Sequence, residues 1–272
     1  MKDLLFEVND GIATITLNRP NSLNAFSIKM IEEWIQALTE VRDNDQIRVL
    51  VLTGNGKAFC AGGDIKAIKN NDGFLNKDGY EEKDFSSTGL NRKNSLWKYV
   101  QRIPLLMEEI DKPTIAAING DAIGAGLDMS LQCDIRISSE RARFGEGYVK
   151  LGIVPGDGGG YFLPRIIGLD KALEMLWTGK IIDAQEAKDI GLVTHVYSHE
   201  LFLEETYKFA ERLAQGPQQA IRLIKRTVQQ GLKTDLRTSL DLVSSYMGLV
   251  TEHVDYQEGV KALMEKRKPN FE

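Results

Sequence analysis

The chain has 272 residues, a formal net charge of −5 and 42% hydrophobic residues, an ordinary balance for a globular protein. The negative charge argues against a general nucleic-acid surface, and no apolar stretch reaches the roughly 18 residues of a membrane span. Acidic residues come too early for a secretory signal, and two cysteines, Cys60 and Cys133, give no disulfide framework. We therefore expect a cytoplasmic protein with no nucleic-acid or membrane partner.

The N-terminal part predicts a hairpin, a helix and a buried strand. Residues 5–8 and 12–17 alternate as strands around an Asn-Asp-Gly turn. Apolar residues recur at helical spacing from 27 to 42, and the continuous apolar run at 49–53 is typical of a buried strand. That strand leads to a glycine turn at 60–66, which we expect to open a helix.

A polar segment precedes the central motif of the chain. Residues 69–95 are charged and lack a clear period, which predicts a mobile loop of the kind that covers a site. A helix is expected to follow up to about Ile110, and then an apolar strand at 114–118. Within residues 120–131 the strand runs into a glycine-rich turn, and the small-residue segment after this turn predicts a buried helix. Asp128 lies in its first turn, and burying a carboxylate costs several kcal/mol unless it is paired, hydrogen-bonded or protonated.

The rest of the chain becomes mostly helical. Residues 135–138 predict another strand, 155–160 a third glycine turn before a helix, and 192–197 the last strand. Helices are expected at about 170–177, 184–190, 200–214, 218–230, 235–249 and 253–267. No linker interrupts the chain, so we expect an α/β core over residues 1–200 and a helical region over 201–272.

Two units of strand, glycine turn and helix stand out, around Gly63 and around Ala125. Glycine lets a ligand approach the backbone, and the first N–H groups of a helix have no partner inside it. Two such turns can aim two N–H groups at one carbonyl oxygen that gains charge, which is an oxyanion hole. One turn alone would more often serve tight packing. Two turns with the buried acid Asp128 favour the catalytic interpretation.

Other site types do not fit the spacing. Met129 stands where a dinucleotide-binding fingerprint needs its third glycine, and Ala58 where a phosphate-binding loop needs Ser or Thr. No Gly-x-Ser-x-Gly elbow occurs in the sequence. The three histidines, His195, His199 and His253, lack metal-ligand spacing, so we expect no metal site.

Two motifs carry a family resemblance: Cys-Ala-Gly-Gly-Asp-Ile at 60–65 and Ala-Ile-Asn-Gly-x-x-x-Gly-Ala-Gly-x-Asp at 117–128. With them the chain resembles the crotonase superfamily, the enoyl-CoA hydratase/isomerase family. The likeness extends to Leu-Asn-Arg-Pro at 17–20 and Leu-Gly-Ile-Val-Pro-Gly at 151–156, and it covers nearly the whole chain. Together the motifs are specific for the superfamily but not for one reaction.

The resemblance implies an α/β fold, a crotonase-type spiral of repeated ββα units with a C-terminal helical trimerisation region. It implies a homotrimer or a dimer of trimers. The substrate would be an acyl-CoA thioester whose oxygen accepts from the N–H groups of Gly63 and Ala125, and no cofactor is expected because coenzyme A is part of the substrate. Lys268 and Phe271 are expected to complete the nucleotide site. The residues implied to bind coenzyme A are Ala25, Ala61, Gly63, Asp64, Ile65 and Lys66.

The sequence departs from the hydratase pattern at the acids. A hydratase carries two glutamates, whereas here Asp128 stands at the first position and Tyr148 at the second. A phenol with a pKa around 10 is a poor base at neutral pH, so Asp128 is the expected acid or base. In an extended segment Glu146 would point the same way as Tyr148, and Asp157 in the third glycine turn is a further candidate. The alternatives are a pocket wall for Tyr148, a solvated loop acid for Glu146, and a turn-forming or capping residue for Asp157.

These residues predict an enzyme that hydrates or isomerises an unsaturated acyl-CoA through an enolate held in the oxyanion hole. Two alternatives stay open: an acyl-CoA hydrolase or decarboxylase on the same scaffold, and a catalytically weak CoA-binding protein. The expected catalytic residues are Asp128, Tyr148, Glu146, Gly63 and Ala125.

Overall fold

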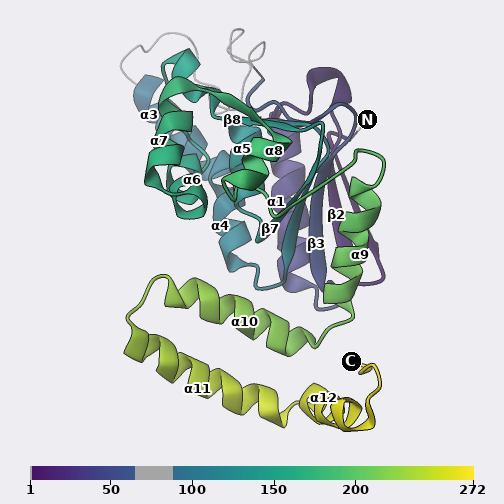
Figure 1. The fold of residues 1–272 in the computed structure, drawn as a ribbon. Coiled ribbons are helices and arrows are strands. Elements are labelled where there is room, and N and C mark those ends of the chain that lie inside the picture. The colour runs from purple at the N-terminus through teal and green to yellow at the C-terminus, as the bar shows by residue number, and fades with distance from the viewer. Residues whose placement is uncertain (1, 65–87) are drawn as a thin grey trace.

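A computed structural model describes residues 2–64 and 88–272, and its strands form two sheets (Figure 1). The larger sheet contains β1 (Leu4–Asn9), β2 (Ile12–Leu17), β3 (Val49–Gly54), β5 (Thr114–Ile118), β7 (Ile135–Ser139) and β10 (His195–Tyr197), in that order. The smaller sheet contains β4 (Ala58–Cys60), β6 (Asp121–Ile123), β8 (Arg143–Gly145) and β9 (Ile181–Asp183), in that order. Apart from the antiparallel β1–β2 and β8–β9 pairs, neighbouring strands run parallel.

Within residues 2–64 and 88–136, helices pack around these sheets, together with short helical turns of other types. They are η1 (Pro20–Ser22, 3₁₀), α1 (Ile28–Asp43), α3 (Thr88–Ser95), η3 (Leu96–Val100, a π-helix), α4 (Arg102–Glu109) and α5 (Ala125–Leu131). The second half contains η4 (Gly147–Leu151, 3₁₀), α6 (Gly159–Ile167), α7 (Leu169–Thr178), α8 (Ala184–Asp189), α9 (Phe202–Ala214), α10 (Gln218–Gly231), α11 (Leu236–Glu252) and α12 (Val254–Glu265).

The larger sheet is buried on both faces because its strands alternate side chains between two layers of helices. On β3, Leu50 and Leu52 face the core cluster that includes Trp34 of α1. Val49 and Val51 face the other cluster, in which α9 packs. A strand buried on both faces reads as a continuous apolar run, so the prediction of a buried strand here is confirmed.

Three consecutive units each place one strand in each sheet. The chain passes from β3 to β4, from β5 to β6 and from β7 to β8, and the second unit continues directly into α5. Because β4 and β6 pair in parallel, their carboxyl ends meet at one edge of the smaller sheet. Two segments leave this edge: residues 61–64 after β4, and the turn at Gly124 that leads into α5. They contain the two glycine turns noted in the sequence.

Two predicted elements differ from the structure. Residues 88–95 form helix α3 rather than loop, and this helix carries no apolar stripe that periodicity could detect. Residues 69–87 of the predicted loop, and Ile65 and Lys66 of the expected helix start, lie outside the described residues. The last strand was predicted at 192–197, but β10 covers only its second half. The N–H groups of Leu192 and Val193 instead donate to the Ala187 carbonyl at the end of α8.

The C-terminal helices divide into one that packs on the sheet and three that lie beyond it (Figure 1). Charged side chains tie α10 to the core: Arg222 and Arg226 both pair with Asp111, and Lys225 pairs with Asp134. The division of the chain at residue 200 stays a prediction. Among the described helices, none has the length and apolarity needed to cross a membrane.

Candidate active site

The two glycine turns lie against each other. A Cβ on Gly126 would stand 2.1 Å from the Cys60 carbonyl oxygen, and a Cβ on Gly62 would stand 3.4 Å from the Ala125 nitrogen. Such a separation leaves no room for a side chain at Gly126, which is why glycine is required there. The backbone around Gly63 and the start of α5 are therefore neighbours, as an oxyanion hole requires.

Ala125, which replaces the usual central glycine, is the first residue of α5. Gly124 caps α5 with a φ of 55°, and the Asp128 N–H makes the first helical bond back to its carbonyl. Ala125 is the first residue of the helix, so its N–H has no partner within the helix. Its own φ is not positive, so the alanine Cβ is accommodated without backbone strain.

The predicted coenzyme A residues come together in part. The Phe26 N–H donates to the Gly62 carbonyl at 2.9 Å, and Phe26 forms an isolated parallel bridge with Gly63. This pairing holds the chain around Ala25 beside the turn that follows β4. The predicted residues that the structure brings to this edge are Ala25, Ala61, Gly63 and Asp64; Ile65 and Lys66 lie outside the described residues.

Arg19 links the chain at Ala25 to Asp64, a role that was not predicted from the sequence. Its guanidinium donates to the Ala25 carbonyl at 2.5 Å and to Asp64 Oδ2 at 3.1 Å. Arg19 also contacts Asp3 at 3.5 Å. The Leu-Asn-Arg-Pro motif at 17–20 draws attention to this arginine, but a local motif does not predict which distant segments the side chain contacts.

Three carboxyl groups and one phenol meet beside α5. Asp128 is fully buried, and the Tyr148 hydroxyl lies 2.7 Å from its Oδ2. The same hydroxyl lies 3.0 Å from Oδ2 of Asp157. Glu146 is 1% exposed and its carboxyl faces that of Asp128. The structure thus gathers Asp128, Tyr148 and Glu146, and adds Asp157.

The expectations for the neighbours of Asp128 change in two respects. The chain from Gly147 onward forms the 3₁₀ turn η4 and is not extended, and Glu146 reaches Asp128 because β8 ends just before it. Glu146 is therefore a buried acid and not a solvated one. Asp157 is 3% exposed and does not cap α6, whose N-cap is Gly158.

Burial sets the protonation states of this cluster. It raises the pKa of Asp128 to about 6, against the lowering effect of the Tyr148 hydroxyl and of the protonated Glu146. Burial and the charge of Asp128 raise the pKa of Asp157 to about 7 and that of Glu146 to about 11. Burial also raises the pKa of Tyr148 well above its usual value. Near neutral pH, Asp128 is the group that most readily carries the negative charge of a base.

The second carboxylate oxygen of Asp128, Oδ1, is buried against the start of α6. Oδ1 lies against Gly159, where a Cβ would stand 2.1 Å away, and among the described residues it has no well-aligned hydrogen-bond partner. Asp128 follows Ala125 by three residues on α5, so both lie on one side of the helix. A thioester oxygen at the Ala125 N–H would put its adjacent carbon near this carboxylate. The arrangement can stabilise an enolate and move a proton beside it.

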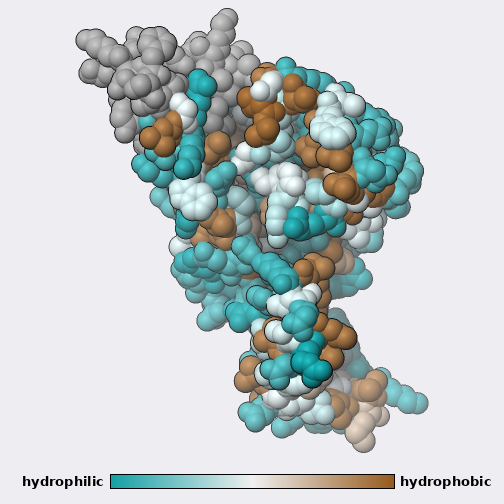
Figure 2. Space-filling model, turned by 90° about the vertical axis from the view of Figure 1, so that its left-hand side faces the viewer, coloured by the Kyte–Doolittle hydropathy of each residue, from teal (hydrophilic) through white to brown (hydrophobic). Residues whose placement is uncertain are grey.

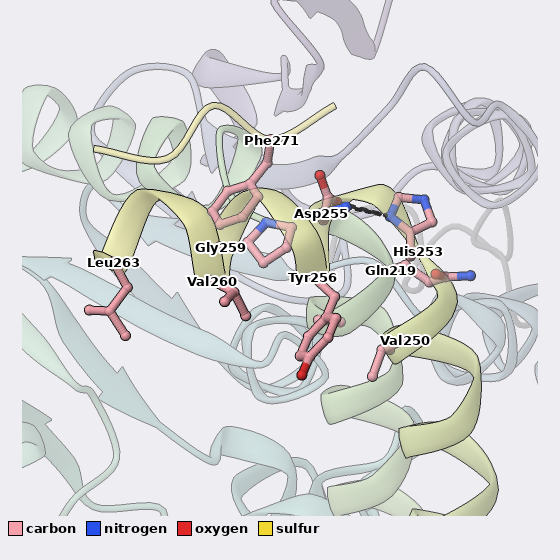
Figure 3. Close-up of a pocket in the computed structure, with 11 residues that line it drawn as sticks. Gln219, Val250, His253, Asp255, Tyr256, Gly259, Val260, Leu263 and Phe271 are labelled. Carbon is pink, nitrogen blue, oxygen red and sulfur yellow. Dashed lines mark hydrogen bonds and ion pairs between the residues drawn. The ribbon is translucent and has the colours of Figure 1, made fainter. Parts of the chain in front are cut away.

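Lys268 and Phe271 lie with the C-terminal helices. Lys268 Nζ is 3.3 Å from Gln215 Oε1, and Phe271 packs over Gly259 (Figure 3). Phe271 lines a pocket of about 310 Å³, in which His253 contacts Asp255. Their part in a nucleotide site stays a prediction. Within the described residues, no group of three or more His, Cys, Asp or Glu could hold a metal ion.

Known proteins match the chain over its whole length. The sequence model of the enoyl-CoA hydratase/isomerase family matches residues 7–272. The chain belongs to the enoyl-CoA hydratase/isomerase family. It is 35% identical to a crotonyl-CoA hydratase of Syntrophomonas wolfei, over 99% of this chain and 98% of that one. It is 34% identical to a 1,2-epoxyphenylacetyl-CoA isomerase of Escherichia coli, over 100% of this chain and 98% of that one.

Solved structures agree. An enoyl-CoA hydratase from Bacillus anthracis superimposes with a TM-score of 0.85 at 35% identity, covering 99% of this chain and 98% of that one. The predicted crotonase fold is confirmed, and the chain is an acyl-CoA enzyme of the enoyl-CoA hydratase/isomerase type.

Proposed function

We propose that this member of the enoyl-CoA hydratase/isomerase family moves the double bond of an enoyl-CoA rather than adding water to it. The observation that carries this proposal is the hydroxyl of Tyr148, 2.7 Å from Asp128, at the position where a hydratase would have its second carboxylate. The site then offers one ionised carboxylate as base. One carboxylate is enough to take a proton from one carbon and return it to another.

The proposed reaction converts a 3-enoyl-CoA into a 2-enoyl-CoA. The Asp128 carboxylate takes a proton from the carbon next to the thioester carbonyl, so that this C–H bond breaks and an O–H bond forms. The N–H groups of Gly63 and Ala125 stabilise the charge that develops on the thioester oxygen. Asp128 then returns the proton to the γ carbon and is ionised again. Atoms balance without any redox step, and no cofactor beyond the coenzyme A of the substrate is needed.

Hydration is the second candidate, because Asp157 supplies another buried carboxyl near Asp128. Water addition needs two groups that hold and activate a water molecule. Here the Tyr148 hydroxyl engages one oxygen of each aspartate, and Glu146 is protonated across the neutral range. These contacts favour isomerisation.

The test compares two substrates on the purified full-length chain. We expect conversion of 3-enoyl-CoA to 2-enoyl-CoA with kcat/KM at least roughly tenfold above that for hydration of 2-enoyl-CoA. Faster hydration would assign the protein to the second candidate. Turnover of malonyl-type CoA esters alone would contradict both.

The proposal includes a homotrimer, or a dimer of trimers, in the cytoplasm. In the described chain α10 and α11 contain no buried residue, although both carry large apolar side chains. Figure 2 shows hydrophobic atoms on the surface of the lower lobe, at the height of α10–α12 in Figure 1. Many large apolar side chains exposed on neighbouring helices are typical of an interaction site, and further copies of the chain are its proposed occupants.

A further inference from the structure

One hydroxyl group lies between two buried carboxyl groups in the active site. Tyr148 Oη is 2.7 Å from Asp128 Oδ2 and 3.0 Å from Asp157 Oδ2, and both distances are within hydrogen-bond range. A phenol carries a single hydrogen, so it makes one full donation at a time. The other contact then requires a hydrogen from the carboxyl group.

Counting protons gives one arrangement that satisfies both contacts without placing two charges together. The Asp157 carboxyl donates its hydrogen to the Tyr148 oxygen, and the Tyr148 hydroxyl donates to an ionised Asp128 carboxylate. If the Tyr148 hydrogen passes to Asp128 and the Asp157 hydrogen passes to Tyr148, the reverse state results, in which Asp128 is protonated and Asp157 is ionised. Buried carboxyl groups that interact this closely titrate as one unit.

We propose that Asp128 and Asp157 hold a single proton between them through the hydroxyl of Tyr148, which makes Asp157 a positioning residue for the base Asp128. This inference rests on the isomerisation proposed above. When Asp157 is protonated, neither Tyr148 nor Asp157 can accept the proton that Asp128 takes from the substrate. Asp128 therefore keeps this proton for the γ carbon.

An ionised Asp157 would divert that proton. The Tyr148 O–H bond would break as an Asp157 O–H bond forms, and the Asp128 O–H bond would break as the Tyr148 O–H bond re-forms. The dienolate would then be left beside an ionised Asp128 that has no proton to return. Activity is therefore highest when the pair holds one proton, and it falls both when a second proton binds and when the last one leaves.

Among the described residues, the other titratable groups that act on the pair or on its neighbour Cys60 have pKa values outside the range of the pair. Glu146, between β8 and η4, has a pKa raised by burial to about 11, and Cys60, at the end of β4, has a thiol pKa raised by burial to about 12. The positive charge of Arg19, which precedes η1, lowers the pKa of this thiol but is outweighed by burial. The uncharged Gln132 of α5 donates to the Asp157 carbonyl. A basic limb near neutral pH is accordingly the loss of the last proton of the pair, which Asp157, with its pKa raised to about 7, holds in the active form.

The test is the pH profile of kcat/KM for the wild type and for Asp157→Asn. An asparagine NH₂ can still donate to the Tyr148 oxygen but cannot ionise. We expect a bell-shaped wild-type profile, and in the variant an unchanged acidic limb with the basic limb moved up by at least about one pH unit. Asp170→Asn, which removes an exposed carboxylate on α7, should keep both limbs. An Asp157→Asn profile that matches the wild type would overturn the proposal.

Tyr148→Phe provides a second, independent variant. Without the hydroxyl there is no path between the carboxyl groups, so the basic limb should again move up. The acidic limb should also move up, because Asp128 loses the donor that stabilises its charge. If Asp157→Asn does not fold, this variant alone decides: a basic limb in the wild-type position would overturn the shared proton.

The outcome can be separated from that of the proposed isomerisation. If the wild type hydrates enoyl-CoA instead, the same profiles are measured on hydration. Independently of turnover, the infrared carbonyl band of protonated carboxyl groups in isotope-labelled aspartate is followed from about pH 5 to about pH 9. In the wild type a band should persist until Asp157 loses its proton at about pH 7, whereas in Asp157→Asn the remaining band, that of Asp128, should already be lost near pH 6. Identical spectra of the two proteins would contradict the shared proton.

Discussion

At the scale of single residues, Glu146 shows how burial changes the chemistry of an acid. Its carboxyl is 1% exposed and faces Asp128 and Asp157, so the folded protein holds it in the neutral form. The unfolded chain releases that proton near the ordinary value of 4.5. Between pH 4.5 and about pH 11, folding is therefore accompanied by the uptake of a proton at Glu146. The free energy of unfolding falls as the pH rises through this range.

Glu146→Gln should stabilise the protein at alkaline pH. Glutamine copies the neutral carboxylic acid and removes the proton uptake, so we expect the free energy of unfolding at about pH 8 to rise by a few kcal/mol, with little change near pH 4. Urea unfolding at both pH values checks this. Glu7→Gln, on the exposed end of β1, is the matched control and should change stability little at either pH. A Glu146→Gln variant no more stable than the wild type at about pH 8 would contradict a buried neutral Glu146.

At the scale of elements, the proposed oxyanion hole depends on the close contact between the end of β4 and the start of α5. Gly126 and Cys60 touch through backbone atoms, and a Cβ at Gly126 would come within 2.1 Å of a carbonyl oxygen. Backbone cannot give way as a flexible side chain can. The position of the Ala125 N–H therefore depends on the glycine that follows it.

Gly126→Ala should separate the two turns. We expect a loss of about 2 to 4 kcal/mol in unfolding free energy, from overpacking and backbone shift, together with a large loss of kcat. Gly160→Ala is the matched control: it lies on α6 with ordinary φ and with nothing within 4 Å of an added Cβ. That variant should be neutral or slightly more stable. Equal stability of the two variants would contradict the contact.

Elements with a regular apolar pattern were predictable from the sequence, and elements without one were not. The continuous run of β3 and the helical spacing of α1 gave correct elements, whereas α3 has no apolar face. Asp128 was found because it lies three residues from Ala125 in one local motif. The meeting of Tyr148 with Asp157 depends on how η4 and α6 pack together, which spacing along the chain does not encode.

At the scale of the whole molecule, the C-terminal helices combine two kinds of contact. Ion pairs to Asp111 and Asp134 hold α10 on the core, while apolar residues on α10–α12 face outward. Leu263 is 81% exposed on α12 and lines the pocket beside Tyr256 and Val260 (Figure 3). In an assembly these side chains would be covered by a neighbouring copy.

Leu263→Glu should break the assembly. A buried, unpaired carboxylate at a subunit contact costs several kcal/mol, so light scattering should shift from three or six times the chain mass of 30.4 kDa toward lower values. Val8→Glu, an exposed apolar position on β1, is the control and should leave the mass unchanged. A wild-type mass of 30.4 kDa would refute the proposed trimer directly.

The central claim is that one carboxylate, Asp128, moves the proton beside the two N–H groups of the oxyanion hole. The most direct measurement is conversion of 3-enoyl-CoA to 2-enoyl-CoA by Asp128→Asn, with calorimetric binding of a CoA ester as the check on folding. Asparagine keeps the shape and still accepts from Tyr148, but it cannot take a proton. We predict that kcat falls by about 10³-fold while binding changes only a few-fold. A variant that isomerises the substrate at the wild-type rate would contradict the account.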